Sequence, residues 1–209
     1  MKGMSQDPGV MTGPGTVERA GRPPVTTAAE LERVALTLFT ARGFAATTVD
    51  DIAAAAGISR RTFFRYYASK KDVVWGDFDQ GLRHMTDVLR EVGDDVPLRE
   101  AVRTAVIRFN ALPAVAVPAH RQRMQLILHV PELQAHGTLR YAAWRAVIAE
   151  FAAGRLRRQV DDLMPQLVGH LALGAALAAY TEWLRDEEAD LERLLHTAFS
   201  AVNVTATPA

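Results

Sequence analysis

The sequence predicts an all-α protein, and three observations carry that prediction. Apolar residues recur at three- and four-residue steps in every ordered segment, and no segment keeps the alternation of a strand. Residues that cap helices precede these segments, and glycines follow several of them. The chain has 209 residues, 49% of them hydrophobic, which suits a small helical domain joined to a larger one.

The composition excludes several classes of protein. The absence of cysteine rules out disulfide bonds, thiolate catalysis and zinc fingers. Residues 1–24 are rich in Gly and Pro without apolar periodicity, so we expect a disordered arm that is not a signal peptide. The apolar stretch from Leu167 to Tyr180 is too short and too rich in small residues for a membrane span. We expect a cytoplasmic protein with no membrane partner.

Residues 25–71 are expected to form a small domain of three helices. The first helix starts at Thr27, which together with Glu30 is typical of a capping box. It carries one apolar face and runs to Arg42, where Gly43 provides a stop signal.

The second and third helices of this domain are joined by a tight turn. Thr48 is placed to cap the second helix with Asp51 as its partner, and Gly57 supplies the left-handed residue that ends it. Ser59 then caps the third helix. Start and stop signals at both ends of the turn predict a helix-turn-helix reader of DNA.

The third helix is basic. Residues 16–72 carry nine Lys or Arg against six Asp or Glu, whereas residues 73–209 carry fourteen against seventeen. This distribution predicts that the first domain binds phosphates, although a charged helix face that only meets solvent is the alternative. The cations and the aromatic residues between them are Arg60, Arg61, Phe63, Phe64, Arg65, Tyr66, Tyr67, Lys70 and Lys71.

Residues 72–205 are expected to form a second helical domain that binds a ligand and dimerises. One long helix, capped by Ser69 and ending at Gly93, should connect the two domains. Five further helices complete a layout of nine. They are expected from about Pro97, after Pro118, over residues 131–155, over residues 164–185 and over residues 191–202.

The helix over residues 164–185 is apolar nearly all round and rich in Gly and Ala, so it must be buried on every side. We expect the chain's own core on one face and a second subunit on the other, with the last helix completing the interface. The alternative is that both helices belong to the core of one chain. The expected interface residues are Gly174, Ala175, Ala178, Ala179, Leu194 and Ala198.

The stretch TTVDDIAAAAGISRRTFFRYYASKKDV and the nine-helix layout resemble the TetR family of bacterial repressors. The resemblance implies a homodimer that binds an inverted repeat in operator DNA. It departs at Phe64, where the family usually has a tyrosine that contacts phosphate. GRPP, ELERVALTLF and LQAHGTLRYAAWRAVIAEF are similar to a narrower group, the regulators of mycofactocin biosynthesis genes. That similarity implies a repressor that long-chain acyl-coenzyme A (acyl-CoA) releases from DNA.

Four residues of the helix-turn-helix are expected to contact DNA directly. Thr48 stands where a phosphate can approach the positive end of a helix, although it could serve only as a cap. Arg60 and Arg61 begin the recognition helix and could read guanine, and Thr62 could contact a thymine methyl group.

Three further residues are expected at the DNA backbone or in its minor groove. Tyr66 and Lys70, near the end of the recognition helix, are interpreted as phosphate contacts. Arg22 precedes two prolines and could enter the minor groove as an arm, or lie in a disordered tail.

A ligand cavity is expected among the helices of the second domain. Arg121, Arg123, Arg140 and Arg145 could hold the phosphates of coenzyme A, or be ordinary surface residues. An apolar and aromatic wall suits an acyl chain, although each of its members could be only a core residue. The expected wall residues are Trp75, Phe78, Phe109, Met124, Ile127, Tyr141 and Trp144.

Neither a metal site nor catalysis is expected. His129, Glu132 and His136 have the spacing of metal ligands, but Pro131 breaks the helix between the first two. The chain has no GxSxG motif and no glycine-rich phosphate loop, so we expect no enzyme and no cofactor. A helical carrier or enzyme that has kept the bundle is the alternative, and it would have no use for the basic recognition helix.

Overall fold

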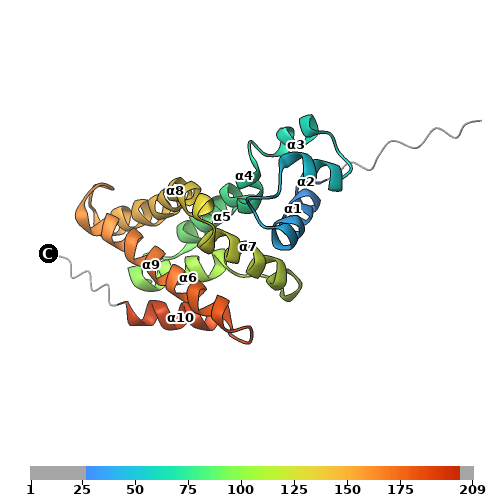
Figure 1. Cartoon of the computed structure of the whole chain (residues 1–209). Helices are drawn as coiled ribbons and strands as arrows, with labels where there is room; N and C mark the ends of the chain where they lie inside the picture. Colours follow the sequence, from blue (N-terminus) through green and yellow to red (C-terminus); the bar gives the residue numbers. More distant parts are fainter. Residues whose placement is uncertain (1–26, 203–209) are drawn as a thin grey trace, which may run out of the picture.

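The computed structural model describes residues 27–202, and within them it contains ten α-helices, one 3₁₀ helix and no strand. The first three helices form a head at one end of the molecule, and α5 to α10 form a larger body (Figure 1). The helices are α1 (Ala28–Arg42), α2 (Val49–Ala55), α3 (Arg60–Tyr66), α4 (Lys70–Trp75), α5 (Phe78–Glu91), α6 (Leu98–Phe109), η1 (Ala114–Ala116), α7 (Val117–His129), α8 (Pro131–Leu156), α9 (Leu163–Arg185) and α10 (Leu191–Ala201).

The head folds as its capping residues predict. Thr27 Oγ1 accepts the N–H of Glu30 at 3.1 Å, and Ser59 Oγ accepts the N–H of Thr62 at 3.1 Å. Gly57, between α2 and α3, has φ of +66°, the left-handed conformation that the turn requires. The apolar faces of the three helices enclose a small core of fully buried side chains. Its largest members are Leu31, Phe39, Ile52 and Phe63.

The connection between head and body is not the single long helix expected from Ser69 to Gly93. The helix is interrupted at Gly76, which adopts φ of +56°, and α5 begins after Asp77. Asp77 accepts the N–H of Gln80 at 3.1 Å and so provides a new N-cap. Taken together as one interrupted helix, α4 and α5 keep the nine-helix layout that the sequence predicts.

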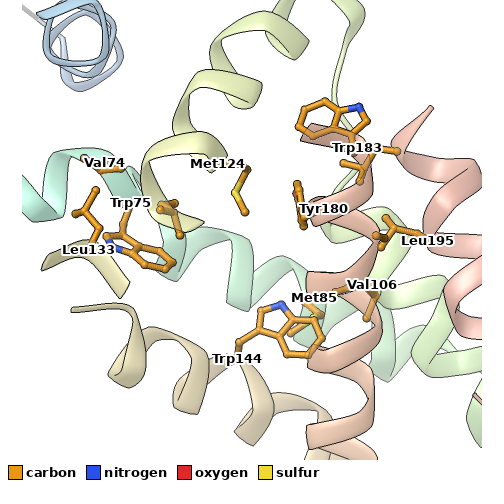
Figure 2. Close-up of a cluster of buried hydrophobic side chains, with 14 of the residues drawn as sticks. Val74, Trp75, Met85, Val106, Met124, Leu133, Trp144, Tyr180, Trp183 and Leu195 are labelled. Atoms are coloured by element: carbon orange, nitrogen blue, oxygen red, sulfur yellow. The ribbon is translucent and has the colours of Figure 1, made fainter. Parts of the chain in front are cut away.

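The core of the body lies where α5, α6, α7, α8 and α9 converge. The two longest helices, α8 and α9, run side by side and α10 packs along α9 (Figure 1). Figure 2 shows Trp75 of α4, Trp144 of α8 and Tyr180 of α9 around Met124 of α7. The core of the body therefore reaches α4, the helix that follows the head.

Candidate DNA-binding surface and effector cavity

The first two of the three arginines of the recognition helix α3 have different surroundings. Arg60 forms an exposed ion pair of 2.8 Å with Asp50 of α2, and its guanidinium lies 5.3 Å from the ring centre of Phe64. Arg61 is exposed and makes no hydrogen bond or ion pair within residues 27–202. Of these two residues, Arg61 is therefore the one that can contact a base without first leaving an ion-pair partner.

The N-terminus of α2 is closed by a reciprocal capping box. Asp51 Oδ2 accepts both the N–H and the hydroxyl of Thr48, at 2.8 and 2.5 Å, and Thr48 Oγ1 accepts the N–H of Asp51 at 3.1 Å. The hydrogen bonds from Thr48 hold the pKa of Asp51 below its usual value, so the carboxylate stays ionised at this helix end. The structure thus places Thr48 in the capping role that was one of its two expected readings.

Lys70, the first residue of α4, is half-buried against the connection between α1 and α2. Its ammonium donates to the carbonyl oxygens of Phe44 at 2.8 Å and Thr47 at 2.9 Å, and it stands 4.5 Å from the ring centre of Phe44. This cation therefore fixes the connection between α1 and α2, which carries Thr48. These contacts give Lys70 a positioning role in the head, and its contact with a DNA phosphate stays a prediction.

The other expected DNA contacts are less well defined by the fold. Thr62 is half-buried, and its hydroxyl lies 3.0 Å from the hydroxyl of Ser59. Tyr66 is half-buried with the guanidinium of Arg65 at 5.3 Å from its ring centre. Arg22 and residues 1–24, the expected arm, lie outside the described residues.

All seven expected wall residues surround one cavity in the body, with a volume of about 220 Å³. The aromatic members meet edge to face in a continuous series, with ring centres between 5.5 and 6.3 Å apart. The cavity therefore spans α4, α5, α6, α7, α8 and α9. The seven residues are Trp75, Phe78, Phe109, Met124, Ile127, Tyr141 and Trp144.

A hydrogen-bonded group of three polar side chains lies in the cavity wall and was not anticipated from the sequence. The Tyr180 hydroxyl donates to Asn110 Oδ1 at 2.6 Å and lies 2.8 Å from His120 Nε2. Burial, together with the charge of Arg123, lowers the pKa of His120 to about 4, so the imidazole is neutral near pH 7. One signal could have indicated His120, because it shares a helical face with the expected wall residues Met124 and Ile127.

Two hydrogen-bond donors in the same wall have no partner. Trp75 Nε1 and Tyr141 Oη are buried and make no hydrogen bond within the described structure. Their rings are in edge contact, 5.6 Å apart. Because unsatisfied buried donors are costly, this part of the wall is suited to a ligand that carries an acceptor oxygen.

The four arginines expected to hold phosphates do not converge at one opening. Only Arg123 lines the cavity, and its guanidinium forms an ion pair of 2.6 Å with Glu32 of α1. Arg121 donates to backbone carbonyl groups at the end of α9. Arg140 binds acidic residues of α4 and α5, and Arg145 makes no ion pair among residues 27–202. The expectation of a four-arginine phosphate site is therefore wrong.

The expected dimer residues on α9 divide into two groups. Ala175 and Ala179 are 7% and 3% exposed within one chain, so they belong to its own core. Gly174 and Ala178 are exposed on the opposite side of the helix, in line with Leu163 and Leu167. On α10, Leu194 and Ala198 are half-buried. A dimer surface on α9 would therefore use Gly174 and Ala178, while Ala175 and Ala179 face the core.

The histidines of the rejected metal site point to different partners. His129 Nδ1 lies 3.0 Å from the carbonyl oxygen of Gln125, whereas His136 Nε2 lies 3.2 Å from Asp72 Oδ1. Within residues 27–202, no group of three His, Asp or Glu side chains is placed to bind a metal ion.

Among the described residues, α9 is the helix that is long and apolar enough to cross a membrane. Half of its apolar stretch is buried inside the protein, as in the core helix of a soluble protein.

Two protein families match this chain, one over the head and one over the body. Residues 33–74 match the family of bacterial regulatory proteins called tetR, and residues 96–206, more than half of the chain, match the MftR C-terminal domain. The chain belongs to the TetR family of transcriptional regulators. Regulators of this family bind operator DNA, act as dimers and are not enzymes.

Individual relatives point in the same direction. The chain is 47% identical over 184 residues, 88% of this chain and 93% of the relative, to a Mycobacterium tuberculosis protein named by inference as the mycofactocin biosynthesis transcriptional regulator MftR. FadR of Thermus thermophilus, solved with lauroyl-CoA, has a TM-score of 0.54 at 23% identity, covering 88% of this chain and all of that one. FadR of Bacillus subtilis, solved with stearoyl-CoA, has a TM-score of 0.61 at 15% identity, covering 83% and 96%. At these identities the two structures show only that the folds are alike.

Proposed function

We propose that the protein is a dimeric repressor of mycofactocin biosynthesis genes that a long-chain acyl-CoA releases from operator DNA. The observation that carries the proposal is the apolar cavity, because α4 forms part of its wall and also follows the head directly. The 47% identity to the M. tuberculosis relative supports the choice of target genes, and the acyl-CoA ligands of the two FadR structures support the choice of effector.

The proposed mechanism acts through the spacing of two recognition helices. Residues 25–71 would bind DNA and residues 72–205 would bind effector and dimerise. In a two-fold dimer, both α3 helices dock only when they lie about one helical turn of DNA apart, roughly 34–36 Å. An effector that moves α4 changes this spacing and releases the operator. The partners are then double-stranded DNA with an inverted repeat, a second copy of the chain and an apolar effector in the cytoplasm.

The size of the cavity supports a change of shape on binding. Its volume of about 220 Å³ is smaller than most ligand pockets, which hold roughly 300–1,000 Å³. A long acyl chain therefore has to move the walls apart. Since the walls include α4, enlarging the cavity is coupled to the position of the head, and by linkage operator DNA weakens effector binding by the same factor.

Fluorescence anisotropy with DNA from upstream of mycofactocin biosynthesis genes tests the proposal. Ligand-free protein should bind this DNA more tightly than a scrambled sequence of equal length. Lauroyl-CoA or stearoyl-CoA should release it, and coenzyme A alone should not. If the protein binds this DNA tightly and specifically but no acyl-CoA weakens the binding, the repressor function stands and the acyl-CoA effector is rejected.

A further inference from the structure

Arg123 belongs to the cavity and to the junction with the head at the same time. On the cavity side it shares the α7 face of His120, Met124 and Ile127, and it is the cation among the described lining residues. On the other side it forms the 2.6 Å ion pair with Glu32 of α1, in which both side chains are largely buried, 20% and 17% exposed. The guanidinium group of Arg123 therefore contacts both the cavity and the head.

The carboxylate of Glu32 also holds the end of the recognition helix. Its second oxygen accepts a hydrogen bond of 2.6 Å from Tyr67, the residue that caps α3. Burial and the adjacent Glu32 carboxylate raise the pKa of Tyr67, so its hydroxyl stays protonated and remains a donor. Glu32 thus joins α1, α3 and α7 through its two oxygens.

The ion pair also rests against the turn that separates α4 from α5. A Cβ atom at Gly76 would collide with the guanidinium of Arg123 and lie 2.9 Å from Glu32 Oε2. The glycine therefore serves two requirements, a positive φ and the close approach of this pair. A displacement of Arg123 changes the packing against the turn as well as the contact with α1.

The polar groups that line the cavity near Arg123 determine which kind of ligand it can bind. Arg123, Trp75 Nε1 and Tyr141 Oη are all donors, and the last two have no acceptor in the described structure. The acidic lining residue, Asp77, is turned to solvent at 65% exposure and is used as the N-cap of α5. An anionic or strongly accepting oxygen fits such a donor set, whereas a cation does not.

We propose that Arg123 recognises an anionic oxygen of the effector and exchanges Glu32 for it, so that the Glu32–Arg123 ion pair reports occupancy of the cavity to the head. This inference rests on the proposed function and assigns a specificity residue within it. Once Arg123 turns to the effector, the Glu32 carboxylate keeps only Tyr67 as a partner, at a position where 17% of its side chain is exposed. An unpaired charge is unstable there, so α1 moves to let the carboxylate reach water, and the head moves with it.

Calorimetry with three probes of equal chain length measures the recognition step. Laurate and lauroyl-CoA carry anionic oxygens, and 1-dodecanol does not. Arg123→Gln should weaken binding of at least one anionic probe by about ten- to a hundredfold, as expected for the loss of a charge-assisted hydrogen bond, and should leave dodecanol nearly unchanged. The affected probe identifies the anionic oxygen as that of a fatty carboxylate or of a coenzyme A phosphate. Arg140→Gln, which removes a cation outside the cavity, is the control and should not discriminate between the probes.

Glu32→Gln tests the exchange in the opposite direction. Without a charge that competes for Arg123, the variant should bind the anionic probe severalfold more tightly, and the probe should release less DNA at saturation. Glu30→Gln, an equal change at an exposed position of the same helix, should behave as wild type. If Arg123→Gln does not fold, this experiment still decides the matter, because a damaged fold does not tighten binding.

The outcomes separate this inference from the proposed function. A wild-type protein that binds none of the three probes rejects the acyl effector. A wild-type protein that binds them all, with no dependence on Arg123 or Glu32, rejects the exchange and leaves the acyl effector standing.

Discussion

Asp72 of α4 and His136 of α8 meet at 3.2 Å, and the same carboxylate oxygen lies 3.3 Å from Arg140 Nη2. The contact ties the helix that follows the head to the longest helix of the body. It is therefore a second junction, after the Glu32–Arg123 pair, between the region of the head and the body.

Asp72→Asn should destabilise the protein in a pH-dependent way. Burial alone would raise the pKa of Asp72, but the hydrogen bond from Ser69, the charge of His136 and the hydrogen bonds from Arg140 and His136 outweigh it and hold the pKa below its usual value. A carboxyl group with a lowered pKa stabilises the fold above its unfolded pKa, about 4, and loses that effect as the pH falls further. In urea unfolding, the free energy of unfolding of Asp72→Asn should be about 1–2 kcal/mol below that of wild type at pH 7, and this difference should shrink towards pH 3. Asp87→Asn, in an exposed pair with Arg90, is the control and should change little.

Arg61→Ala and Lys70→Ala should weaken DNA binding in different ways. Arg61 is exposed without a partner, so its loss should cost about 1–3 kcal/mol at one base pair and little stability. Lys70 donates to buried carbonyl groups, so its loss should lower the free energy of unfolding by about 1–3 kcal/mol and weaken all sequences alike. Anisotropy with specific and scrambled DNA, beside urea titration, distinguishes them. Equal stability of both variants would contradict the positioning role of Lys70.

A charge on α9 should have opposite effects on its two faces. Nothing lies within 4 Å of a Cβ atom at Gly174, so Gly174→Asp should keep the chain folded and disrupt a dimer formed through this face. Ala175→Asp places its charge in the core of one chain and should unfold it. Analytical ultracentrifugation and circular dichroism provide the two measurements. A fully dimeric Gly174→Asp protein would place the interface elsewhere.

His120 should make the protein less stable in mild acid. Its folded pKa of about 4 lies below the unfolded value of about 6.5, so the unfolded chain binds the proton first as the pH falls. Stability should decline between pH 6.5 and pH 4, by up to about 3 kcal/mol from this residue. His120→Gln can still bond Tyr180 and does not titrate, so its urea midpoint should fall less over the same interval. Parallel curves for the two proteins would remove His120 as the cause.

Filling the cavity should change the preferred length of the effector. Each methylene buried contributes about 0.8 kcal/mol, so affinity should rise about fourfold per carbon until the cavity is full. Ala176 lines the cavity, and Ala176→Leu should shift the maximum to shorter acyl chains while ligand-free DNA binding stays the same. Calorimetry with a series from octanoyl-CoA to stearoyl-CoA provides the measurement. An unchanged maximum would show that the chain lies elsewhere.

The sequence predicted the wall of the cavity better than its polar groups. Trp75, Phe78, Met124 and Trp144 could be predicted because buried apolar residues repeat with the helical period. The pairing of Glu32 with Arg123 joins residues 91 positions apart and leaves no local pattern. Tyr180, Asn110 and His120 meet for the same reason, through packing that one sequence does not encode locally.

Two predictions from the sequence differ from the structure for specific physical reasons. Trp75 and Phe78 continue the three- and four-residue apolar spacing across Gly76, so periodicity alone conceals the interruption that Asp77 caps. α9 is apolar nearly all round, so its pattern cannot distinguish Ala175, in the core, from Gly174, on the surface.

The turn at Gly76 determines how stiff the connection between head and body is. At 1.5 Å per residue, α4 is about 9 Å long and α5 about 21 Å, in place of one stiff rod. Two short rods joined at a glycine transmit bending poorly, so the orientation of the head depends on the side-chain contacts that span the joint. Two of those contacts are the ion pairs Glu32–Arg123 and Asp72–Arg140, whose strength varies with pH and salt in a way that helix stiffness does not. The response of this protein to its effector should therefore depend on the ionic conditions of the cell as well as on the effector's concentration.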